Sequence, residues 1–114
     1  MTTKKLINTI THALEEMKAQ EIVNIDVRKL TSITDNMIIC SGTSNRHTKA
    51  IADKVISEIK AKGFQALGVE GLETGEWILV DLGDAVVHIM LPQAREFYSI
   101  EKLWTTVEKT RRDK

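Results

Sequence analysis

Residues 76–91, Glu-Trp-Ile-Leu-Val-Asp-Leu-Gly-Asp-Ala-Val-Val-His-Ile-Met-Leu, decide the fold because they predict a tight β-hairpin. Two β-rich runs flank Gly83 and Asp84, and glycine supplies the positive φ that a two-residue hairpin turn requires. With these two residues in the turn, alternation along each strand places six apolar side chains on one side of the ribbon. We call this side the core face and expect it to be buried: Ile78, Val80, Leu82, Ala85, Val87 and Ile89.

The other side of the hairpin, which we call the second face, mixes large apolar and polar side chains. It carries Trp77, Leu79, Asp81, Val86, His88 and Met90. An aspartate has little place in a core, and solvent-facing strands rarely combine a tryptophan with a methionine. The pattern therefore predicts an exposed surface that contacts a partner.

Charge is unevenly distributed along the chain, although the formal net charge is zero. Residues 63–94 contain no lysine or arginine, and their acidic side chains are Glu70, Glu73, Glu76, Asp81 and Asp84. Such a segment is either a solvated face or a docking surface for a basic partner. A phosphate backbone is a poor candidate, so we expect neither a membrane nor sequence-specific nucleic acid as a direct partner.

Length and composition predict one domain over residues 1–114, because 114 residues that are 42% apolar can bury a substantial core. The single cysteine, Cys40, cannot form an internal disulfide, which suits a reducing compartment. The first residues show no signal-peptide pattern, and no stretch approaches the roughly 20 apolar residues that span a bilayer. We therefore expect a soluble, cytoplasmic protein.

Periodicity predicts further helices and strands on both sides of the hairpin. Helices are expected at residues 3–19, from the turn 41–47 to Lys62 and Gly63, and at 95–107; strands are expected at 21–27, 37–40 and 64–69. The run 37–40 is typical of a buried central strand, and 64–69 is expected to run parallel to it through a right-handed crossover. Residues after about 108 are expected to form a mobile tail. This order predicts a two-layer α/β sandwich on a mixed sheet of about five strands.

The turn Gly42–Asn45 has two interpretations. Free N–H groups at a helix start can bind a phosphate, or Thr43, Ser44 or Asn45 can simply cap the helix. The Walker and Gly-x-Gly-x-x-Gly patterns are both absent, and no two acidic residues stand at i and i+2 to hold a metal pair. The capped helix is the favoured interpretation, and a nucleotide-binding or nucleotidyl-transferring enzyme is kept as the alternative function.

The residue types that carry most catalytic chemistry are scattered. The spacing of His12, His47 and His88 does not resemble a metal site, and Cys40 lies in an apolar run that predicts an inert thiol. His88 could act as a general base, but a packed or hydrogen-bonded surface histidine is the favoured interpretation. We therefore expect a protein without catalytic residues, metal or cofactor.

Several stretches resemble the ribosomal silencing factor family, the Iojap-related proteins. The longest is residues 33–47, Ile-Thr-Asp-Asn-Met-Ile-Ile-Cys-Ser-Gly-Thr-Ser-Asn-Arg-His. The others are residues 69–71, 77–84, 86–90, 95–98 and 103–104. These motifs follow the family order over nearly the whole chain, so the resemblance is specific.

The resemblance implies both a fold and a function. The implied fold is nucleotidyltransferase-like without the catalytic carboxylates. The implied function is to bind a basic protein of the large ribosomal subunit at the intersubunit face, block joining of the small subunit, and repress translation when nutrients are scarce. The expected contact residues are Trp77, Leu79, Asp81, His88, Met90 and Tyr98, with Glu70 and Asp84 steering the basic partner. A homodimer formed through the same face is a further alternative.

Overall fold

The computed structural model describes residues 2–32 and 34–98, and within this part it confirms the predicted order α-β-β-α-β-β-β-α. The helices are α1 (Thr3–Glu16), α2 (Asn45–Ala61) and α3 (Pro92–Tyr98). The strands are β1 (Gln20–Asp26), β2 (Asn36–Ser41), β3 (Gly68–Glu70), β4 (Trp77–Asp81) and β5 (Ala85–Met90). The α/β class and the mixed five-stranded sheet are therefore confirmed.

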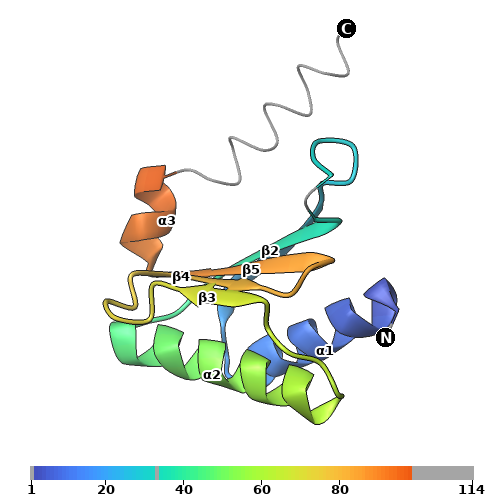
Figure 1. The fold of residues 1–114 in the computed structure, drawn as a ribbon. Helices are drawn as coiled ribbons and strands as arrows, with labels where there is room; N and C mark the ends of the chain where they lie inside the picture. The colour runs from blue at the N-terminus through green and yellow to red at the C-terminus, as the bar shows by residue number, and fades with distance from the viewer. Residues whose placement is uncertain (1, 33, 99–114) are drawn as a thin grey trace, which may run out of the picture.

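The helices lie on both faces of the sheet. Helices α1 and α2 pack side by side under one face, and α3 lies against the other face near one end (Figure 1). The main core fills the space between the sheet and α1 and α2. It contains Leu6, Ile10 and Leu14 of α1, Ile51, Val55 and Ile59 of α2, and the whole core face of the hairpin.

The β4–β5 hairpin has the predicted register. Ile78 pairs with Ile89, Val80 pairs with Val87, and the Leu82 N–H donates to the Ala85 carbonyl at 2.9 Å. Gly83 has φ +85°, which only glycine adopts without strain, and its N–H donates to Asp81 Oδ1 at 2.9 Å. The turn residues and the core face are thus as the sequence predicted.

The strand order is β1-β2-β5-β4-β3, and the third strand differs from expectation. The predicted strand 64–69 shortens to Gly68–Glu70, at the edge beside β4. It runs in the same direction as β2, as expected, but β5 and β4 lie between them. Strand β2 pairs in parallel with β5 instead, because both are apolar on each face and suit the sheet centre.

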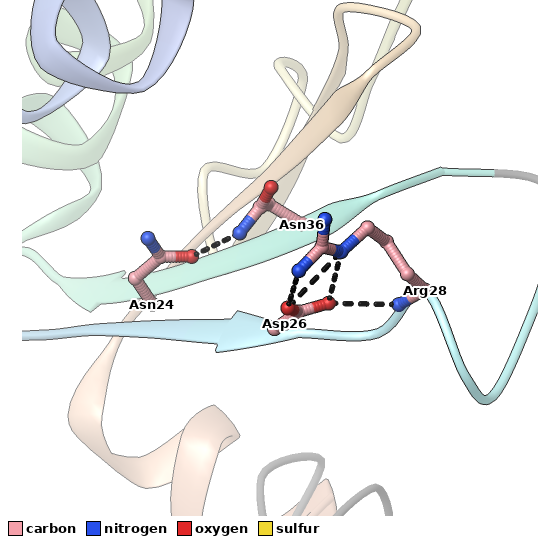
Figure 2. Close-up of polar contacts among 4 residues, drawn as sticks. All are labelled: Asn24, Asp26, Arg28 and Asn36. Carbon is pink, nitrogen blue, oxygen red and sulfur yellow. Dashed lines mark hydrogen bonds and ion pairs between the residues drawn. The ribbon is translucent and has the colours of Figure 1, made fainter. Parts of the chain in front are cut away.

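An ion pair lies at the end of β1, which is the edge strand opposite β3. The Arg28 guanidinium donates from Nη2 to Asp26 Oδ2 at 2.6 Å, and the Arg28 N–H donates to Asp26 Oδ1 at 3.0 Å (Figure 2). These bonds lower the pKa of the Asp26 carboxyl to about 2. Nearby, Asn36 Nδ2 donates to Asn24 Oδ1 at 3.1 Å across the β1–β2 pair. The contacts fix the chain where it leaves the edge strand.

The helix ends follow local capping rules. Ser44 caps α2 by accepting from the His47 N–H at 3.1 Å, and Gly63, with φ +88°, follows the C-cap Lys62. Helix α3 begins at Pro92, not at residue 95 as predicted, because proline is well suited to a first helical position. The rest of the predicted helix 95–107, and the tail after 108, lie outside the described residues.

Candidate functional site

The second face of the hairpin forms a shallow hollow with β3. A cavity of about 390 Å³ is lined by Glu70, Gly71, Trp77 and Leu79. Glu70 is exposed and pairs with Leu79 across the β3–β4 register, while Trp77 and Leu79 are half-buried. Two predicted contact residues and one predicted steering residue therefore line the same hollow, which combines an aromatic ring, an aliphatic side chain and a carboxylate.

Helix α3 covers part of the second face, which contradicts the expectation that all of it is exposed. Met90 is completely buried, in a second apolar cluster with Val27, Met37 and Ile39, and Ala94 of α3 packs against this cluster. The predicted exposure of Met90 is wrong, because a strand pattern indicates which side a residue lies on but not whether a helix covers it. The Tyr98 side chain lies outside the described residues.

His88 is packed and hydrogen-bonded, as predicted, but with 4% of its surface exposed it does not lie at the surface. Its Nδ1 accepts a hydrogen bond of 2.9 Å from the Trp77 indole Nε1–H. The two rings lie 5.8 Å apart at 44°. Because an indole N–H can only donate, Nδ1 must be unprotonated in this arrangement. Burial lowers the pKa of His88 to about 4, which keeps the ring neutral at physiological pH.

The depressed pKa of His88 predicts a loss of stability in acid. Between pH 6.5 and 4 the unfolded chain binds a proton at His88 and the native protein does not, so the free energy of unfolding falls as the pH is lowered through this window. At 1.36 kcal/mol per pH unit, the expected loss from this group is about 3 kcal/mol. Urea unfolding of the wild type and His88→Asn at pH 7 and pH 4 measures it. Equal losses in the two proteins would assign the acid sensitivity to other groups.

The acidic residues of the base-free segment do not form one cluster. Asp81 is half-buried and accepts from the Gly83 N–H, so its carboxylate holds the hairpin turn. Asp84 is exposed at the turn, where its Oδ2 accepts from the Thr3 hydroxyl at 3.4 Å. Glu70 lies beside Leu79 at the hollow. The structure therefore places Glu70 beside Trp77 at the hollow, and Asp84 at the opposite end of the hairpin.

The loop that carries Gly71 shapes the hollow, a role that no sequence pattern indicated. Gly71 has φ +88°, and a Cβ there would lie 2.0 Å from the Trp77 carbonyl oxygen. Further along, Thr48 Oγ1 of α2 donates to the Gly75 carbonyl at 2.6 Å, and Asn45 Nδ2 donates to the Thr74 carbonyl. The start of α2 thus holds the loop that forms one wall of the hollow.

Arg95 anchors α3 over the second face and was also missed. The residue is 8% exposed; Nη1 donates to the Glu21 carbonyl at 2.8 Å and to Ser41 Oγ at 3.1 Å. These bonds join α3 to the start of β1 and the end of β2. The available signal in the sequence was that Arg95 closely follows the last strand, β5. A buried arginine requires several acceptors, and here the ends of neighbouring strands supply them.

Two backbone N–H groups of the turn Gly42–Asn45 donate hydrogen bonds within the protein. The Gly42 N–H donates to the Met90 carbonyl at 3.0 Å, and the Thr43 N–H donates to His47 Nδ1 at 2.9 Å. The opposite nitrogen of His47 lies 2.7 Å from the Met17 carbonyl, so that Nε2 carries the proton. These contacts favour the capped-helix interpretation over a phosphate site.

Cys40, the remaining candidate nucleophile, is packed in the core. Burial raises the pKa of the Cys40 thiol to about 12, as expected of an inert core cysteine.

Within residues 2–32 and 34–98, no group of three or more His, Cys, Asp or Glu side chains could hold a metal ion. In the same part of the chain, no helix has the length and apolar character needed to cross a membrane.

A family model described as "Ribosomal silencing factor during starvation" matches residues 1–114. The chain belongs to this family. The ribosomal silencing factor of Haemophilus influenzae is 52% identical over 99 residues, which are 87% of this chain and 97% of the relative. A crystal structure of a Chromobacterium violaceum protein superposes with a TM-score of 0.90 at 45% identity, covering 92% of this chain and 88% of that one.

A mouse protein is also similar to the chain. It is named "Mitochondrial assembly of ribosomal large subunit protein 1" and is 36% identical over 102 residues, which are 87% of this chain but 45% of the mouse protein. The family resemblance inferred from the motifs is therefore confirmed. Both the family model and the Haemophilus influenzae relative are described as ribosomal silencing factors.

Proposed function

We propose that this silencing factor binds a basic protein on the intersubunit face of the large ribosomal subunit and so prevents the small subunit from joining. The observation that carries the proposal is the hollow lined by Glu70, Gly71, Trp77 and Leu79, in a segment without lysine or arginine. The large-subunit target is supported by the name of the mouse relative, which refers to assembly of the large ribosomal subunit. Translation would be repressed in the cytoplasm when nutrients are limiting.

The hollow fits the side chain of an arginine or lysine from the partner. The Trp77 ring can accept a cation against its face, and the Glu70 carboxylate can pair with the same charge. Leu79 offers apolar surface to the aliphatic stem of such a side chain. A tryptophan beside a carboxylate is the combination expected of an interface centre that selects a basic protein rather than an RNA backbone.

Steric occlusion is tested by sedimentation of purified subunits with increasing silencing factor. Subunits should move from the joined to the separated state without nucleotide, and the effect should saturate at one copy per large subunit. Raising the small-subunit concentration should weaken the effect, because both ligands compete for one face. A requirement for ATP would favour the nucleotide-dependent enzyme, and saturation at two copies would favour binding as a homodimer.

Charge reversal of Glu70 should slow association with the large subunit. Glu70→Lys replaces an exposed carboxylate beside the hollow by an ammonium, which opposes the electrostatic steering of a basic partner. We expect the association rate to fall severalfold at low salt and its salt dependence to flatten. Stopped-flow measurement over a salt series gives both quantities.

Glu15→Lys is the matched control, since Glu15 is exposed on α1, on the other side of the sheet. Equal effects of the two reversals would show that net charge, and not the position of Glu70, governs association. Asp84→Lys then measures whether the hairpin turn contributes to steering as well.

A further inference from the structure

We infer that His88 is a positioning residue for partner binding: it fixes the orientation of the Trp77 indole through Nδ1 and does not itself touch the partner. The inference rests on the proposed function, since it assigns a role within the same surface. It replaces the sequence-based expectation that His88 belongs to the contact surface.

The geometry separates the two residues into an exposed and a buried member. Trp77 is half-buried and lines the hollow, whereas His88 is 4% exposed and lies beneath the surface on the adjacent strand. Trp77 pairs directly with Met90, so His88 is its diagonal neighbour across the β4–β5 pair, within reach of a long aromatic side chain. The 2.9 Å bond from the indole Nε1–H to His88 Nδ1 closes this diagonal.

The residues paired with His88 on the adjacent strands do not compete with the Trp77 indole for Nδ1. In the sheet register His88 lies between Leu79 of β4 and Ile39 of β2, whose side chains cannot form hydrogen bonds. An indole free to rotate about χ1 and χ2 would have to be ordered on binding, and that ordering opposes association. The hydrogen bond therefore holds the wall of the hollow in place before the partner arrives.

Two substitutions separate the acceptor from the rest of the histidine. In His88→Asn, the amide oxygen takes nearly the place of Nδ1 and can still accept from the indole. In His88→Leu the acceptor is lost and an apolar side chain remains in a largely buried site. We expect large-subunit affinity to be retained in His88→Asn and to fall about two- to tenfold in His88→Leu, the range of a single hydrogen bond.

Trp77→Phe supplies the background that tests the mechanism. Phenylalanine keeps an aromatic ring but has no N–H, so His88→Leu should cause no further loss of affinity in this background. If His88 touched the partner directly, His88→Leu would cost the same affinity in both backgrounds, and the inference would be wrong. Affinities are compared at a temperature where thermal unfolding shows all four proteins to be folded.

The indole N–H resonance reports on the orientation without any ribosome. The chain has two tryptophans, and the signal lost in Trp77→Phe is that of Trp77. In the wild type and His88→Asn this proton should be shifted downfield and exchange slowly with water; in His88→Leu both properties should be lost. An unchanged resonance in His88→Leu would overturn the inference. Failure of the wild type to bind large subunits would instead overturn the proposed function and leave this measurement intact.

Discussion

Gly71→Ala is expected to destabilise the protein by about 3 kcal/mol or more, or to prevent folding. A methyl group at this position would lie 2.0 Å from the Trp77 carbonyl oxygen, and the backbone would also have to hold φ +88° with a side chain. This oxygen belongs to the backbone of β4, which cannot rotate away as a flexible side chain would. Urea unfolding followed by circular dichroism measures the loss.

Two other glycines separate the contributions at Gly71. Gly63 has the same φ of +88° with nothing within 4 Å, so Gly63→Ala should cost only the conformational strain, about 1–2 kcal/mol. Gly68 has open space and no positive φ, so Gly68→Ala should be close to neutral. If Gly71→Ala were no worse than Gly63→Ala, the close approach to Trp77 would not constrain the loop.

Trp77→Ala is expected to weaken binding to the large subunit by at least about 2 kcal/mol, roughly thirtyfold. The side chain forms one wall of the hollow, and a large aromatic group at an interface centre typically dominates binding. Trp77 is half-buried against the second apolar cluster, which contains Met90. The free energy of unfolding should therefore also fall in Trp77→Ala, but by less than the roughly 3–5 kcal/mol lost when a fully buried tryptophan is replaced by alanine. Equilibrium binding to purified large subunits, below the unfolding temperature, measures the effect.

Phe64→Ala is a matched control for the loss of an aromatic group. Phe64 is 37% exposed and lines a separate hollow with Lys5 and Thr9 of α1. The Phe64→Ala substitution should leave the affinity for the large subunit unchanged. A similar loss in both variants would indicate nonspecific apolar adhesion, and not recognition by the second face.

The hairpin could be predicted because its determinants are local. The Gly83 turn and a period of two are sufficient to define the register, and that register gives the core face without reference to other elements. The same register places Trp77 diagonally opposite His88, so the bond between them could also have been found from the sequence. Central strand β2 was predictable for a similar reason, since its residues are apolar on both faces.

What could not be predicted depends on contacts between distant parts of the chain. The burial of Met90 requires α3 to turn back over β5, and Arg95 secures that turn through Ser41, 54 positions earlier. The short β3 and the role of Gly71 depend on how closely a loop approaches β4. Local patterns contain the preference of each segment but not the competition among segments for positions in the sheet.

The parallel pairing of β2 with β5 has a consequence for how the chain folds during its own synthesis. Residue 41 ends β2, yet the strand's second neighbour is complete only at residue 90. Strand β1 can pair with β2 early, but the other backbone edge of β2 stays unpaired until the hairpin has left the exit tunnel. Folding is therefore expected to be a late event that follows release of the C-terminal half, with a transiently exposed central strand at risk of aggregation.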